Sequence, residues 1–299
     1  MANNHQYHFK GDDFVNLYSI SAEITTKSPL HIGTGETYQE SPGDKSSKDD
    51  KKIPQIAQID RDFNNLPYIP GSAIRGVVRH YLLNIFSCFG TTIAQDPDYD
   101  KLNHFRIMKQ DDQVKYMETQ ASLLEQLFGT PFCESKIEFW DAHLLPSQTV
   151  TQSSYAAKGW NASRMSYVVR SVAIDPVTGA AEENKLYSFD VAPTGLKFSM
   201  HVVGRNLSDA EVGFLLLGLR GFNSSLYPLT IGAMSGRGFG RMNFKLNGIY
   251  KVDKTGLPQW LSKISQSGDA GYGALAQGSD LSAQAVNYIN SFKQTFMNS

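Results

Sequence analysis

The sequence has few cysteines and no long apolar run. Two cysteines in 299 residues cannot form the disulfide framework that holds small secreted domains together. Cys88 and Cys133 each lie beside apolar residues, so we expect both to be small buried side chains. No apolar run approaches the roughly 20 residues that cross a bilayer, and the polar residues 1–13 have no signal-peptide core. These absences predict a cytoplasmic protein with no membrane partner.

An excess of charge of either sign is also missing. The chain has 28 Lys and Arg against 29 Asp and Glu, for a net charge of -1. This balance argues against a protein that coats nucleic acid non-specifically, because such proteins are basic overall. Residues 155–245 nevertheless carry an excess of four positive charges. This bias fits either a basic stripe on one face or a solvated surface with no partner.

Hydrophobic periodicity divides the chain into strands and helices. Strands are predicted at residues 15–26, 136–145, 165–172, 185–191, 196–203 and 242–252. Helices are predicted after Ser72, at residues 121–128, after the capping pair Ser208 and Glu211, and at residues 281–296. The order of strand, helix, strands, helix and strand predicts an α+β fold of the ferredoxin-like or RRM-like type (β-α-β-β-α-β). Many RNA-binding domains use the open sheet of this fold.

We expect one domain at residues 15–252, followed by a linker and helix at residues 253–299. Within the domain we expect an inserted loop at residues 36–58, an irregular segment at 96–120 and a β-hairpin at 164–192. The loop is predicted because residues 36–52 have almost no apolar side chains, and loops of that length are functional or disordered.

A proline-stiffened bend leads into the first helix. Pro67 and Pro70 keep this approach extended, and Ser72 is predicted to cap the helix that follows. Backbone N–H groups at a helix start favour an anion, and Arg75 and Arg79 lie on one helix face where they could follow a phosphate backbone. Simple capping beside a solvated basic face is the alternative interpretation.

A glycine-rich segment precedes the last predicted strand. Gly236 and Gly238 let the backbone approach a ligand closely, Arg237 and Arg241 add charge, and Phe239 could stack on a base. The phosphate-binding pattern G-x-x-x-x-G-K-[ST] is absent from the sequence. A tight structural turn is the alternative interpretation.

Taken together, these segments resemble the RAMP superfamily of CRISPR–Cas proteins. The first is Leu30-His31-Ile32-Gly33-Thr34-Gly35, and the others are residues 66–79, 127–129, 136–142, 172–181 and 231–241. The resemblance implies a modified RNA-recognition fold that assembles with other subunits along a crRNA, as in a type III effector complex. The hairpin would then be a thumb that presses on the guide–target duplex held by a neighbouring subunit.

The resemblance, the glycines and the basic residues together define a predicted RNA-binding set. Its members are His31, Gly33, Gly35, Ser72, Arg75, Arg79, Arg164, Arg170, Gly236, Arg237, Gly238, Phe239 and Arg241. The expected ligands are crRNA and target RNA.

The resemblance also implies cleavage of the target RNA as an activity of the family. In the family one Asp lies a few residues before an Arg-Asp or Lys-Asp pair, and Arg61-Asp62 resembles that pair. Six residues before Asp62 stands Ile56, so the ungapped pattern has no carboxylate there. The longer loop offers Asp44, Asp49 and Asp50 as alternatives. Asp50 is the candidate ligand for a divalent metal (Mg²⁺ or Mn²⁺), and a solvated charge run is the other interpretation.

Two other functions remain open on the sequence. Relatives with a similar glycine-rich segment process crRNA precursors without metal, and His31 would then be a general acid or base. A His after a strand, however, more often packs than catalyses. The third possibility is an unrelated ferredoxin-like binding module.

Overall fold

The computed structural model describes residues 7–39, 55–97, 109–146, 160–174, 176–267, 276–277 and 280–297. Its central sheet has the strand order β4-β7-β1-β8-β9, and each neighbouring pair is antiparallel. The strands are β1 (Asn16–Thr26), β4 (Ile137–Phe139), β7 (Lys197–Arg205), β8 (Met242–Asp253) and β9 (Ala276–Gln277).

Two helices connect these strands in the ferredoxin-like order. α1 (Gly71–Phe86) follows β1 and α5 (Asp209–Arg220) follows β7, so the core runs β1, α1, β4, β7, α5, β8. β7 lies between β4 and β1, and β8 pairs with the other side of β1. The α+β fold predicted from the sequence is therefore confirmed.

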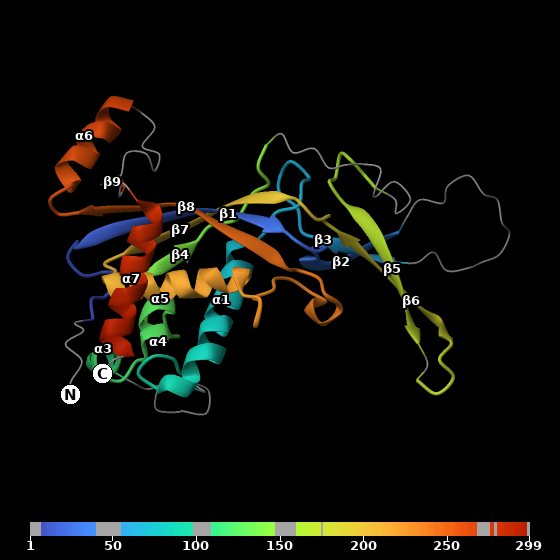
Figure 1. Ribbon diagram of the computed structural model, residues 1–299, viewed down its shortest axis with the longest axis horizontal. Helices are drawn as coiled ribbons and strands as arrows, with labels where there is room; N and C mark the ends of the chain where they lie inside the picture. The colour runs from blue at the N-terminus through green and yellow to red at the C-terminus, as the bar shows by residue number, and fades with distance from the viewer. Residues whose placement is uncertain are drawn as a thin grey trace.

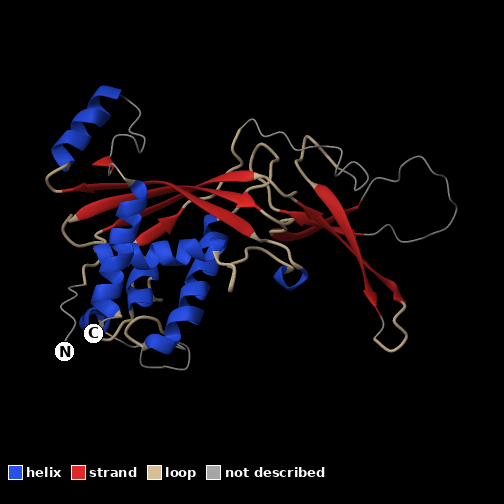
Figure 2. Cartoon of the chain, viewed as in Figure 1, coloured by secondary structure: helices blue, strands red, loops and turns tan. Residues whose placement is uncertain are grey.

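One face of the central sheet is buried against helices. Tyr18, Ile20, Ala22 and Ile24 alternate along β1 and are all buried in the main core, as the period of a strand requires. Figures 1 and 2 show α1, α5 and α7 (Leu281–Phe296) on the same side of the sheet. We call the opposite side of the sheet, which none of these three helices covers, the outer face.

The C-terminal helix α7 belongs to the same core. A Cβ placed on Gly213 of α5 would lie 2.0 Å from the carbonyl oxygen of Tyr288 in α7, so only glycine permits this approach of the two helices. Ala285, Ile289 and Phe292 of α7 are buried. α5 itself starts with the predicted capping box of Ser208 and Glu211.

A second sheet holds the predicted hairpin. Its strand order is β2-β3-β6-β5, with β2 (Gly33–Gln39), β3 (Gln55–Ile59), β6 (Ala181–Val191) and β5 (Tyr167–Ile174). β5 and β6 are antiparallel, which confirms the hairpin, and β6 pairs in parallel with β3. Figure 1 shows β5 and β6 extending away from the helices.

Several local predictions were wrong. Parts of the expected loop at 36–58 belong to β2 and β3, because β3 buries Ile56 and Ile59 and pairs with β6. The expected irregular segment contains α3 (Gln110–Thr119), and the C-terminal linker contains α6 (Leu257–Ser267) and β9. Cys88 is exposed and Cys133 is partly buried.

The start of α1 also differs from the prediction. The N-cap residue is Pro70, which has no capping side chain, so Ser72 lies exposed in the first turn and does not cap the helix. Only glycine fits at the first residue of the helix, because a Cβ on Gly71 would lie 2.1 Å from the carbonyl oxygen of Phe139. Asp141 accepts a hydrogen bond from the Gly71 N–H at 2.8 Å.

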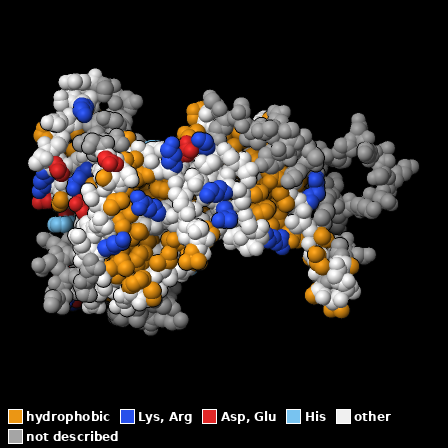
Figure 3. Space-filling view, in the orientation of Figure 1, with side chains coloured by type: hydrophobic (Ala, Val, Ile, Leu, Met, Phe, Trp, Pro, Cys, Tyr) orange, Lys and Arg blue, Asp and Glu red, His pale blue; other side chains and the backbone are white. Residues whose placement is uncertain are grey.

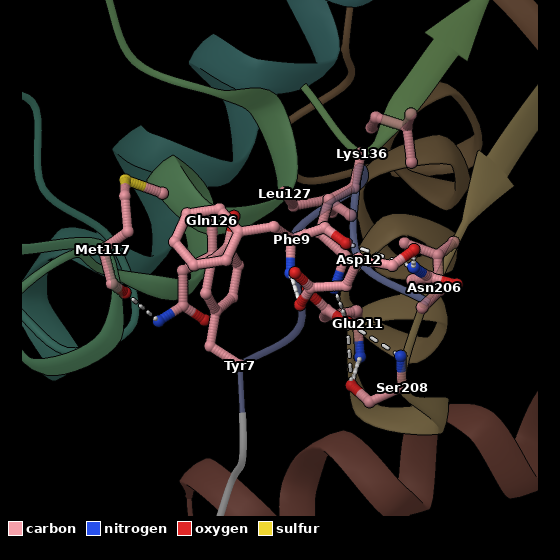
Figure 4. Close-up of polar contacts among 12 residues, drawn as sticks. Tyr7, Phe9, Asp12, Met117, Gln126, Leu127, Lys136, Asn206, Ser208 and Glu211 are labelled. Carbon is pink, nitrogen blue, oxygen red and sulfur yellow. Dashed lines mark hydrogen bonds and ion pairs between the residues drawn. The ribbon is translucent and has the colours of Figure 1, made fainter. Parts of the chain in front are cut away.

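A buried ion pair fastens β4 to the start of α5 (Figure 4). Lys136 Nζ lies 2.7 and 2.8 Å from the two carboxylate oxygens of Glu211, and each side chain is 1% exposed. The same carboxylate accepts hydrogen bonds from the N–H and hydroxyl of Ser208. The ring of Tyr7, from the N-terminal segment, covers Lys136 Nζ at 5.2 Å. The ion pair and the ring of Tyr7 thus connect the N-terminal segment, the start of β4 and the start of α5.

Candidate nucleic-acid interface

Two of the predicted motifs are in direct contact. The carbonyl of His31 accepts a hydrogen bond from the Ala233 N–H at 2.8 Å, and that of Pro29 accepts one from the Gly240 N–H at 2.9 Å. A Cβ on Gly232 would lie 2.4 Å from the His31 carbonyl oxygen, so this approach requires glycine. The segment around His31 and the glycine-rich segment therefore form one surface element.

His31 itself faces the interior. Its side chain is buried, Nδ1 lies 2.7 Å from the carbonyl oxygen of Asp190, and its ring contacts Phe189 edge to face at 5.3 Å. His31 thus connects its own segment to β6 of the hairpin. Gly33 and Gly35, which follow it in β2, are exposed. A buried imidazole gives no support to the precursor-processing enzyme in which His31 would be the acid or base.

The glycine-rich segment presents its arginines on the surface. It contains the short helix η5 (Ser235–Arg237), and Gly236, Arg237 and Gly238 are exposed, with Gly238 at a φ of +84°. The Arg237 guanidinium lies 4.9 Å from the ring centre of Tyr187 in β6. This cation–π contact places a charged group between the loop and the hairpin.

The last part of this segment leads into β8. Phe239 is partly buried, whereas Arg241 is exposed. The Arg241 backbone pairs with Thr230 and accepts a hydrogen bond from the N–H of Lys27, which is also exposed. Lys27 is thus a basic neighbour of Arg241 that the sequence analysis did not select, because the two residues are far apart in the chain.

Arg75 and Arg79 of α1 contact other parts of the chain. Arg75 donates a hydrogen bond to the Phe128 carbonyl, at the end of α4 (Leu123–Phe128), and its guanidinium lies 5.8 Å from the Phe128 ring. Burial lowers the pKa of Arg75, and the nearby charge of Arg79 adds to this effect. Arg79 pairs with Asp96 at 2.6 Å. Both arginines lie on the α4 side of α1.

The opposite flank of α1 does approach the glycine-rich segment. A groove of about 330 Å³ lies between α1 and the chain that leads into this segment. It is lined by Gly76, Val77, His80, Tyr81, Tyr227, Pro228, Leu229 and Thr230. The rings of Tyr81 and Tyr227 stack across it with centroids 5.7 Å apart. This flank of α1 therefore contacts the residues just before the glycine-rich segment, whereas Arg75 and Arg79 contact Phe128 and Asp96.

The root of the hairpin is held by Arg61. Its guanidinium donates to the carboxylate of Asp190 at 2.8 Å, to the carbonyl of Arg164 and to the hydroxyl of Ser166. Arg61 and Asp190 are both buried, and Arg164 lies 3.6 Å from the same carboxylate. Arg170, on the same hairpin, is exposed on β5. Arg61, the first residue of the pair that resembles the family's Arg-Asp pair, thus has a structural role at the root of the hairpin.

Charge and apolar surface are unevenly distributed. Figure 3 shows Lys and Arg side chains across the middle of one face, whereas most of the Asp and Glu side chains in view gather at its left end. Exposed basic residues of the elements that surround the groove and β8 are Lys27, Arg220, Arg237, Arg241 and Lys245. Each of these side chains has the sign of charge that attracts a phosphate backbone.

No group of three or more metal-binding side chains occurs among the described residues. The predicted metal ligand Asp50 and the alternatives Asp44 and Asp49 lie outside the described residues. In the described part of the chain, no helix is long and apolar enough to cross a membrane.

The ferredoxin-like sheet is an arrangement that many RNA-recognition domains use. The family model of the RAMP superfamily matches residues 23–243, which is more than half of the chain, and the protein belongs to this superfamily. Membership indicates a CRISPR-associated RNA-binding protein, and RAMP proteins typically act in complexes. A search of curated proteins found no match.

Proposed function

We propose that the chain is a crRNA-binding backbone subunit of a type III CRISPR interference complex, located in the cytoplasm. Its partners are crRNA, target RNA and other effector subunits. The observation that carries this proposal is the contact of the arginine-bearing glycine segment with the His31 segment on one side and β6 on the other. An RNA strand bound there would lie at the root of the hairpin arm.

The test is the salt dependence of RNA binding. Arg237→Ala and Arg241→Ala each remove one charge from the surface, so each should lower the slope of log K against log salt by about 0.7, the value for one contact with a single strand. Lys293→Ala, at an exposed position of α7, is the control and should leave the slope unchanged. Parent-like slopes in both arginine variants would remove this segment from the interface.

Arg75 and Arg79 remain predicted RNA contacts, with a smaller expected effect. Each is already engaged within the chain, by Phe128 and Asp96 respectively. An RNA phosphate would have to compete with these partners, which reduces the gain in binding. Alanine at either position should therefore weaken binding less than alanine at Arg241.

We also propose that the complex cleaves target RNA with the help of a divalent metal (Mg²⁺ or Mn²⁺). Asp50 is the candidate ligand, and Asp49 and Asp44 are the alternatives in the same stretch of sequence. When bound, the metal would stabilise negative charge on the scissile phosphate. Cleavage that chelation by EDTA abolishes would support this proposal, and cleavage that persists in EDTA would contradict it.

A further inference from the structure

An exposed histidine on the outer face of the central sheet is held by a buried carboxylate. His143 Nδ1 lies 3.5 Å from the Asp62 carboxylate; the histidine side chain is 53% exposed and the aspartate side chain 7%. The other carboxylate oxygen of Asp62 accepts hydrogen bonds from the N–H groups of Asn64 and Leu66 at 2.9 and 3.0 Å. These bonds keep the Asp62 carboxylate in place beside the imidazole.

A tyrosine supports one flat side of the same imidazole. The rings of Tyr68 and His143 stack with centroids 5.9 Å apart and an interplanar angle of 17°. The Tyr68 hydroxyl donates to the Asp60 carboxylate at 3.0 Å. Burial and the charge of Asp60 raise the pKa of Tyr68, so its hydroxyl keeps its proton and this bond. Asp62 thus contacts the imidazole at one ring nitrogen, and Tyr68 covers one flat side of the ring. The other edge and the other flat side make up the exposed part.

Strand geometry places His143 on the outer face. Its carbonyl accepts a hydrogen bond from the Ser199 N–H of β7, and the next residue, Leu144, pairs with Phe198. Phe198 is fully buried on the helix side of the sheet. Because neighbouring residues of an extended chain point to opposite sides, His143 lies on the outer side together with Ser199.

An exposed tryptophan lies on the same face. Trp140 is 47% exposed, and its ring lies 6.1 Å from that of His201, two residues after Ser199 on β7. The Trp140 N–H donates to the carbonyl of His201, and the His143 carbonyl accepts from the N–H of Ser199, so the two residues lie beside β7 positions two residues apart, about 7 Å. An aromatic side chain on which a base can stack is a common feature of sites that bind single-stranded RNA.

We propose that Trp140 and His143 form an RNA subsite on the outer face of the sheet, separate from the glycine-rich segment. A base stacks on the Trp140 indole, and a ring N–H of His143 donates a hydrogen bond to an adjacent phosphate. Asp62 and Tyr68 are positioning residues. The inference rests on the proposed function, because it adds a second contact to an RNA that the glycine-rich segment also binds.

Two substitutions test the contribution of His143. His143→Ala removes the imidazole, whereas His143→Gln keeps a side chain that can donate a hydrogen bond to a phosphate.

The experiment measures fluorescence anisotropy of a fluorescein-labelled oligouridylate of about ten nucleotides with the full chain. Trp140→Ala should weaken binding by about 5- to 150-fold, the range for loss of one stacked base. Trp140→Phe should restore most of that loss, and Trp260→Ala on α6 is the control. His143→Ala should bind more weakly than the parent, and His143→Gln should bind more tightly than His143→Ala.

The outcomes separate this inference from the proposed function. If Arg241→Ala weakens binding while Trp140→Ala and His143→Ala bind as the parent does, the subsite does not exist and the proposed function stands. If the parent chain does not bind the RNA at all, both fall. If Trp140→Ala does not fold, Trp140→Phe together with His143→Ala still decides the question.

Discussion

Replacing Lys136 by methionine tests the buried ion pair that joins β4 to α5. The substitution keeps the length of the side chain but leaves the Glu211 carboxylate, 1% exposed, without its two contacts at 2.7 and 2.8 Å. Breaking a buried pair by removing one partner costs about 3–5 kcal/mol, because the remaining charge is desolvated and uncompensated. A typical domain is stable by about 5–15 kcal/mol, so this loss is a large share of the free energy of unfolding.

Urea denaturation of the parent and of Lys136→Met measures this loss. Lys197→Met is the matched control, because Lys197 pairs with Glu23 at 3.2 Å but its side chain is 50% exposed. An exposed pair of this kind contributes about 1 kcal/mol or less. Adding Glu211→Gln to Lys136→Met should cost less than the sum of the two single changes, with a coupling of about 0.5–3 kcal/mol. Lys136→Met with a stability equal to that of the parent would refute a buried pair.

Three further predictions follow from the packing and from the sequence. Gly213→Ala should destabilise the fold by about 1–3 kcal/mol, because the new methyl group meets the α7 backbone, whereas Gly76→Ala, in open space on α1, should be neutral or stabilising in the same thermal-unfolding assay. Burial lowers the pKa of His201, so the folded state binds fewer protons than the unfolded chain, and stability should fall as pH drops through about 6.5. His201→Gln should flatten that loss when unfolding is measured against pH. Asp50→Ala should abolish metal-dependent cleavage of target RNA and leave its binding intact, and unchanged cleavage would remove Asp50 from the reaction.

Periodicity was sufficient to predict the core of the fold. Alternation in β1 and the capping box at Ser208 are local signals, and both elements formed where the sequence indicated. The wrong predictions concern segments whose structure depends on distant partners. β3 has only five residues, and it becomes a strand by pairing with β2 on one side and, on the other, with β6, more than 120 residues later.

The candidate site was predictable in part for the same reason. The glycine pattern indicated a close backbone approach, and Gly232 does meet the His31 carbonyl. Helical spacing showed that Arg75 and Arg79 share a face, but it contains no information about what that face contacts. The pairing of Arg61 with Asp190 joins residues 129 positions apart, and no local pattern reveals such a pair.

The guanidinium of Arg61 has a mechanical consequence for the hairpin arm. It bonds at once to Asp190 in β6, to Arg164 and Ser166 before β5, and to Asn65 on the way into α1. Both strands of the arm and the segment that leads into α1 are therefore held by hydrogen bonds to a single planar guanidinium. These shared hydrogen bonds restrain the base of the arm, so Arg61 fixes the direction in which the arm leaves the body of the protein.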